Sequence, residues 1–97
     1  MSNDDAAREV SRTELLGKLE QLHLLGLGTV VAFEYVNHEG KHGTRRVRMT
    51  DIEFRIDWPH YPTTQWLMSG ECLDRKACRR FAVSKMENIR AAELSNG

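Results

Sequence analysis

The chain has no long hydrophobic run, and it contains only two cysteines and two prolines among its 97 residues. No apolar stretch approaches the roughly 20 residues that a helix needs to cross a bilayer. The N-terminus carries Asp4 and Asp5 and lacks the basic start and apolar segment of a secretory signal. These absences predict a cytoplasmic protein with no membrane association, and the length predicts a single domain with a modest core.

The cysteines and histidines do not form a recognisable reactive or metal-binding pattern. Cys72 and Cys78 are too few for a disulfide framework, and five residues separate them, which is not the spacing of a CxxC motif. The histidines are scattered, and the nearest two, His38 and His42, fall in a glycine-containing turn. Zinc sites need clustered ligand pairs. We therefore predict no metal and no cofactor.

Features of an enzyme are also missing. No Ser-His-Asp or Cys-His arrangement is recognisable, and no glycine-rich phosphate loop follows a strand. Asp51, Glu53 and Asp57 lie close in sequence and could form a carboxylate or magnesium site, but a solvated strand face explains them more simply. We predict that the chain is not an enzyme.

The formal net charge is zero, but the charge is unevenly distributed. The first 25 residues carry five acidic and three basic residues, a net of −2, whereas residues 41–90 carry eleven basic and six acidic residues, a net of +5. This asymmetry indicates anion binding by the C-terminal part, although it is smaller than in a dedicated DNA-binding domain.

The N-terminal region is expected to form one helix. Residues 1–10 are expected to be disordered or frayed, and Ser11 to Glu14 form a capping-box pattern that predicts a helix over 11–26. Gly26 is the predicted C-terminal cap. The apolar positions with helical spacing are Leu15, Leu16, Leu19, Leu22 and Leu25. This stripe packs either against the rest of the chain or against a second subunit.

The remaining sequence, residues 28–94, predicts short β-strands. Alternating or β-branched segments occur at 29–36, 44–49, 51–58, 65–72 and 79–83, separated by turn residues. A single helical turn is expected at 84–88, followed by a last strand or short helix at 89–94. One helix before about five evenly spaced strands predicts a mainly β (α+β) fold, a small five-stranded β-barrel.

The most informative segment runs from Trp66 to Met86. Trp66, Met68, Gly70 and Cys72 fall on one strand, a basic loop with Arg75 follows, and Arg79, Phe81, Val83, Lys85 and Met86 alternate through the next segment. Upstream, Tyr35, Gly40, Arg45, Val47 and Ile52 complete an ordered set. This set resembles the WYL domain, found mostly in bacterial and phage transcription regulators, over roughly residues 29–93. Leu67 and Ala82 depart from the family pattern, which has Tyr and Arg there.

The resemblance implies an Sm-like β-barrel and a basic ligand-binding surface. Arg45, Arg75, Arg79 and Lys85 match basic positions of the family pattern, and Tyr35 and Trp66 could offer ring faces for stacking a base. Arginine and lysine beside aromatic rings suit nucleic acid or a nucleotide. Arg46, Arg48 and Arg80 alternate out of step with these positions and are interpreted as ordinary surface residues.

Two functions remain open at this point. The first is a regulatory or ligand-sensing module that binds a negatively charged ligand, single-stranded nucleic acid or a nucleotide, in transcription regulation or phage defence. The second is a protein-interaction or homo-oligomeric assembly module that uses the N-terminal helix. No helix-turn-helix pattern precedes the strands, so a complete transcription factor is not expected.

Overall fold

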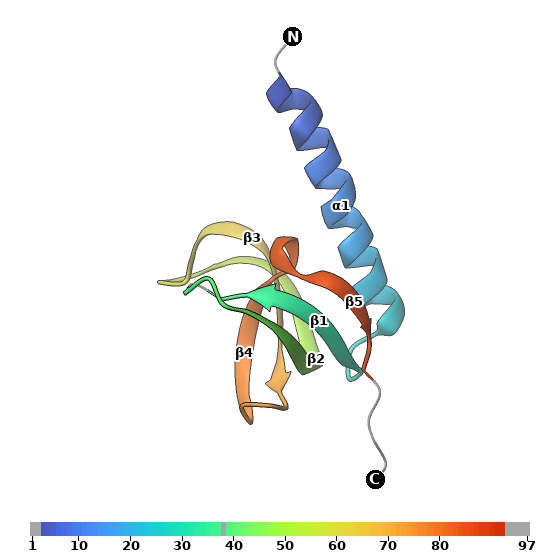
Figure 1. Ribbon diagram of the computed structural model, residues 1–97, viewed down its shortest axis with the longest axis vertical. Coiled ribbons are helices and arrows are strands. Elements are labelled where there is room, and N and C mark those ends of the chain that lie inside the picture. The colour runs from blue at the N-terminus through green and yellow to red at the C-terminus, as the bar shows by residue number, and fades with distance from the viewer. Residues whose placement is uncertain (1–2, 38, 93–97) are drawn as a thin grey trace.

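One helix packs beside a strongly curved sheet of five antiparallel strands (Figure 1). The computed structural model describes residues 3–37 and 39–92, with side chains from residue 12 onward. The elements in chain order are α1 (Asn3–Leu25), β1 (Val30–Val36), β2 (His42–Asp57), β3 (Tyr61–Cys72), β4 (Ala77–Ala82), the 3₁₀ turn η1 (Val83–Lys85) and β5 (Glu87–Ala91). The predicted mainly β (α+β) class is confirmed.

The sheet order is β4-β3-β2-β1-β5, with every neighbouring pair antiparallel. Within the described residues, the two edge strands β4 and β5 do not pair with each other, so the predicted closure into a barrel is not confirmed. The predicted last segment 89–94 corresponds to β5, and its residues 93 and 94 lie outside the described part of the chain.

Helix α1 begins earlier than the sequence indicated. It runs from Asn3 through the predicted cap at Ser11, because Ala6, Ala7 and their neighbours favour helix and no residue breaks it. Part of the segment predicted to be disordered or frayed is therefore helical, and the first half of α1 projects beyond the sheet (Figure 1). The predicted end is confirmed: Gly26 has a positive φ of 87° and its N–H donates to the Leu22 carbonyl.

The leucine stripe of α1 packs within the same chain. Leu22 is fully buried, and Leu15, Leu19 and Leu25 are partly buried against the core, whereas Leu16 of the predicted stripe is exposed. The core cluster against which they pack draws on all five strands, η1 and Met86, and its other members include Val31, Phe33, Val47, Met49, Met68, Phe81, Val83 and Ile89. This face of the helix is therefore not available to a second subunit.

Side chains of α1 also bind the edge of the sheet at β5. The Lys18 ammonium donates to the Ser84 carbonyl at 2.9 Å and forms an ion pair with Glu87 at 3.2 Å. The Gln21 amide donates to the carbonyl of Ile89, a backbone acceptor on β5. These polar contacts fix the orientation of α1, while the leucines supply the apolar contact area.

Strand β2 joins two segments that the sequence separated. Val47 and Met49 face the core, and after a register shift between Met49 and Asp51 the partly buried Ile52 does so as well. The shift is a β-bulge, which inserts one residue and reverses the alternation of side chains. The core-facing positions change from odd to even residue numbers because of a bulge within one strand, and not because one strand ends and another begins.

Glycine is required at position 70 on β3 because the backbone of β2 approaches it closely. It pairs with Met49 on β2 and Arg79 on β4, and a β-carbon there would collide with the Arg48 carbonyl oxygen and the Val47 side chain. A carbonyl oxygen in a paired strand cannot move aside without distorting the ladder. The small residue of the motif is thus explained by packing between two strands.

We predict that Gly70→Ala lowers the free energy of unfolding by about 1–3 kcal/mol, because the added methyl group overpacks the sheet. The matched control is Gly17→Ala, since a β-carbon at Gly17 on α1 meets nothing within 4 Å. That change should raise stability by up to about 1 kcal/mol through helix propensity. Urea denaturation of both variants measures the difference, and equal stability of Gly70→Ala and the wild type would contradict the argument.

Among the described residues, no helix combines the length and the apolar character that crossing a bilayer requires.

Candidate functional site

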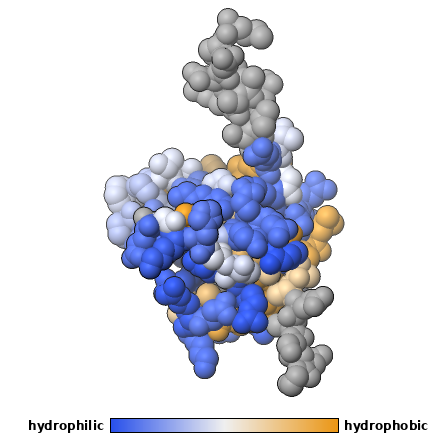
Figure 2. Space-filling view, viewed as in Figure 1, coloured by the Kyte–Doolittle hydropathy of each residue, from blue (hydrophilic) through white to orange (hydrophobic). Residues whose placement is uncertain are grey.

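An open hollow of about 810 Å³ lies on the sheet where β1, β2, β3, β4 and η1 meet. Its charged lining consists of six basic and two acidic side chains, a net of +4 for the described residues. We name this feature the cationic hollow, and its charged residues are Lys41, Arg45, Arg75, Arg79, Arg80, Lys85, Glu39 and Asp57. Most of the surface in this view is hydrophilic (Figure 2).

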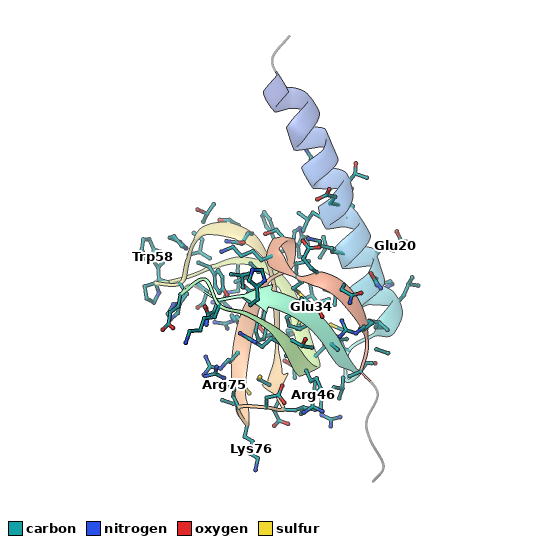
Figure 3. All side chains as sticks on the ribbon, viewed as in Figure 1. Glu20, Glu34, Arg46, Trp58, Arg75 and Lys76 are labelled. Carbon is teal, nitrogen blue, oxygen red and sulfur yellow. The ribbon has the colours of Figure 1, made fainter. Side chains whose placement is uncertain are left out.

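Five of the six residues that the sequence singled out line this hollow. Arg79 comes from β4, Arg75 from the β3–β4 turn, Lys85 from η1, Arg45 from β2 and Tyr35 from β1. Figure 3 shows Arg75 on one side of β4 and Arg46 on the other. The basic side chains therefore line the same hollow, although up to forty residues of sequence separate them (45 to 85).

Strand register explains how Arg45 and Arg79 reach the hollow. Arg79 pairs with Gly70 and lies two residues before Phe81, and Arg45 pairs with Phe33 and lies two residues before Val47. Because side chains alternate along a strand, each arginine shares its face with a core residue. Both therefore extend the core-facing side of the sheet beyond its apolar part.

Arg45 is further placed by Gly43. A β-carbon at Gly43 would meet the Arg45 guanidinium, so the arginine side chain folds back over this glycine. Gly43 also faces Tyr35 across the β1–β2 ladder. The absence of a side chain at Gly43 leaves room for Arg45 next to Tyr35.

Most cations of the hollow lack an ion-pair partner. Among the residues that the structure describes, Arg80 is paired with Asp57 at 2.9 Å, whereas Lys41, Arg45, Arg75, Arg79 and Lys85 form no ion pair. These five cations therefore line one hollow, which keeps a net charge of +4 when Glu39 and Asp57 are counted. Such a surface attracts anions, and guanidinium groups suit phosphate or carboxylate oxygens.

Cations elsewhere on the surface are more often paired. Lys18, Arg46, Arg55 and Arg90 each contact a carboxylate. The hydrogen bond from Arg46 holds the pKa of Asp74 below its usual value, with a smaller Coulombic contribution from Arg45. A hydrogen bond from Arg90 likewise lowers the pKa of Glu34. The contrast sets the hollow apart from an ordinary salt-bridged surface.

The sequence interpretation missed two important lining residues, Arg80 and Asp57. Alternation placed Arg80 on the opposite face from Arg79, and Asp57 was read as part of a solvated carboxylate row. β4 is an edge strand, and the long Arg80 side chain reaches Asp57, 23 residues away in sequence. No local sequence signal predicts this contact, because it depends on how the β2–β3 hairpin folds against β4.

Two tyrosine hydroxyls connect strands at the wall of the hollow. The Ala82 N–H donates to the Tyr35 hydroxyl at 3.0 Å, and the Tyr61 hydroxyl donates to the Arg80 carbonyl at 3.1 Å. The two hydroxyls lie 3.1 Å apart, so the proton between them belongs to Tyr35. This tyrosine relay links β1 and β3 to the outer edge of β4, the strand that carries Arg79 and Arg80.

The relay perturbs the titration of Tyr61. Burial is the largest cause that raises the pKa of Tyr61 well above its ordinary value. An ionised Tyr61 would lose its hydrogen bond to the Arg80 carbonyl, since a phenolate cannot donate. Tyr61 is therefore a structural hydroxyl rather than a proton donor or nucleophile near neutral pH.

The two predicted stacking residues occupy different environments from those expected. Trp66 is not among the lining residues; it packs against Phe54 with ring centroids 5.3 Å apart and contacts the core. Tyr35 lines the hollow but is only 6% exposed, with its ring inside the core cluster. Neither residue presents an open ring face to the hollow.

Metal-binding chemistry has no support in the described part of the chain. No group of three or more His, Cys, Asp or Glu side chains there could hold a metal ion. Cys72 is buried and Cys78 is exposed, and both are free thiols. His38, one of the histidines weighed as ligands, lies outside the described residues. Asp57 is bound to Arg80 and Glu53 to Arg55.

We predict that Tyr61→Phe lowers stability by about 1–2 kcal/mol near neutral pH, because the Arg80 carbonyl and the Tyr35 hydroxyl each lose a partner. The difference in stability between the wild type and Tyr61→Phe should become smaller at high pH. The unfolded tyrosine ionises near about pH 10, whereas the raised pKa keeps the folded one protonated. The wild type therefore loses stability above that pH, and the variant lacks this loss.

Urea denaturation at about pH 8 and about pH 11 measures this difference, since the two pH values bracket the ionisation of an unperturbed tyrosine. Other ionisable groups affect both proteins equally, so the comparison isolates Tyr61. A stability gap that stays constant between the two conditions would contradict the assignment.

No protein-family model matches the chain, and no curated protein matches it either. The hollow must therefore be interpreted from its own residues.

Proposed function

We propose that the chain is a non-catalytic regulatory or ligand-sensing module that binds a negatively charged ligand, nucleic acid or a nucleotide, in the cationic hollow. The observation that carries this proposal is that Arg45, Arg75, Arg79 and Lys85 line one hollow and form no ion pair among the residues that the structure describes. Unpaired clustered cations repel one another, and a bound polyanion would relieve that repulsion. A role in transcription regulation or phage defence is part of the proposal and follows from the WYL-like pattern.

The WYL-like interpretation also extends to the fold. We propose that the curved five-stranded sheet is an open form of an Sm-like barrel. The element order supports this: one helix, four strands in a meander, a short 3₁₀ turn and a last strand returning to β1. Tyr35, Arg45, Gly70 and Arg79, which carried the resemblance, all lie at or beside the hollow or its wall.

Leu67 and Ala82, two of the positions that depart from the family pattern, are neighbours in the sheet. Leu67 on β3 pairs directly with Ala82 on β4, and both are fully buried. Neither lines the hollow. These two departures therefore fall in the packed interior and not among the cations of the hollow.

We predict that Arg79→Ala weakens binding of a labelled single-stranded oligonucleotide about tenfold, a loss of about 1.4 kcal/mol. If all five unpaired cations contact phosphates, the slope of log K against log salt should be about −3.5 for the wild type and about 0.7 shallower in the variant. Fluorescence anisotropy over a salt series measures both quantities.

The matched control is Arg48→Ala. Arg48 is an exposed arginine on β2 that does not line the hollow and forms no ion pair among the described residues. Its removal changes the net charge equally and should alter affinity far less. Absence of binding at low salt by a folded wild type would refute the proposal, and so would equal losses in the two variants.

A second candidate function is assembly through α1. The stripe facing the core is occupied, but Leu16, Leu24 and Leu27 are 65%, 76% and 62% exposed. An apolar patch is visible at the C-terminal end of α1 (Figure 2). Exposed leucines of this kind are compatible with a homo-oligomer or a protein partner.

Assembly predicts that light scattering after size-exclusion chromatography gives a multimer at high protein concentration. Leu16→Glu combined with Leu24→Glu should then yield a folded monomer, since neither side chain contributes to the core. A monomeric wild type would contradict homo-oligomeric assembly and leave the ligand-binding proposal untouched.

A further inference from the structure

Three aromatic rings of the core beside the cationic hollow enclose one another. Phe33, Tyr35 and Phe81 pack edge to face, with centroid separations of 5.1, 5.2 and 6.0 Å between the three pairs. Their exposures are 0%, 6% and 4%. A base can stack only on a ring face that solvent reaches. Tyr35 and Phe81 line the hollow but cannot serve as such platforms without disrupting the core.

Several of the groups that could read the edge of a base are also engaged within the protein. The side-chain oxygen Oδ1 of Asn37 accepts hydrogen bonds from the backbone N–H groups of Glu39 and Lys41, each at 2.9 Å. The Tyr61 hydroxyl lies between Tyr35 and the Arg80 carbonyl, and Asp57 is bound to Arg80. The side chains that remain unpaired in the hollow are mainly cations, which bind phosphate oxygens whatever the base.

We propose that the hollow recognises a linear chain of phosphate groups and not the bases attached to it. This inference rests on the proposed function and specifies its ligand. Within the described part of the chain, five cations form no ion pair; they come from the β1–β2 turn, β2, the β3–β4 turn, β4 and η1, and their charge exceeds that of a single phosphate monoester, which is about −2 at most. A nucleic-acid backbone or inorganic polyphosphate supplies several phosphates in a row and would match them.

The test compares three ligands of equal phosphate number with the full chain. The first is a mixed-sequence single-stranded DNA, the second is the same strand with every base removed, and the third is inorganic polyphosphate as a competitor. We expect the intact and abasic strands to bind within about threefold of each other. Whichever of DNA and polyphosphate binds more tightly identifies the source of the phosphates.

Base stacking would give a different result, because each stacked base contributes about 1–3 kcal/mol. An abasic strand that binds tenfold or more weakly than the intact strand would overturn this inference while leaving the proposed function in place. Failure of all three ligands would instead defeat the proposed function itself. The two failures are therefore distinguishable.

Two protein variants sharpen the comparison. Arg79→Ala should weaken binding of all three ligands by the same factor, since it removes a phosphate contact. His60→Ala should leave the ratio of intact to abasic affinity unchanged, although His60 is an exposed ring at the hollow. A selective loss for the base-bearing strand in His60→Ala would show stacking and contradict the inference.

Discussion

The tyrosine relay is the constraint on which the shape of the cationic hollow depends. β4 is bound to the sheet through β3 on one side, and on the other side its Arg80 carbonyl and Ala82 N–H bond to the tyrosine hydroxyls. Tyr35 and Tyr61 therefore hold β4 toward β1 where backbone pairing does not. The strand that carries Arg79 and Arg80 is placed opposite Arg45 by two side chains, and the sheet curves without closing.

Electrostatics and packing are organised differently on the two sides of the molecule. Near α1 and β5, charges are paired locally, as in Lys18 with Glu87 and Arg90 with Glu34. At the hollow, apolar rings form the floor and unpaired cations surround it. Exposed ion pairs contribute little to stability, so the apolar core supplies most of it. The cationic hollow is thus supported by the fold without contributing to it.

Local periodicity made much of this architecture predictable from sequence. The leucine spacing of α1 and the cap at Gly26 follow from helical periodicity and turn residues, whereas the grouping of Arg45 with Arg79 was expected from the resemblance to the WYL domain. The helix start at Asn3 was missed because a capping pattern at Ser11 can also occur inside a helix. The open sheet, the Arg80–Asp57 pair and the position of Trp66 depend on long-range packing, which no local pattern encodes.

The side-chain contacts at the two outer strands have a consequence for encounters with other polypeptides. Backbone groups on an outer strand ordinarily invite a foreign segment to extend the sheet. Here the acceptors at Arg80 and Ile89 and the donor at Ala82 already have intramolecular partners, from Tyr61, Gln21 and Tyr35. β-augmentation at these points would first have to displace them, so a protein that docks on this chain would meet side chains rather than an unoccupied ladder.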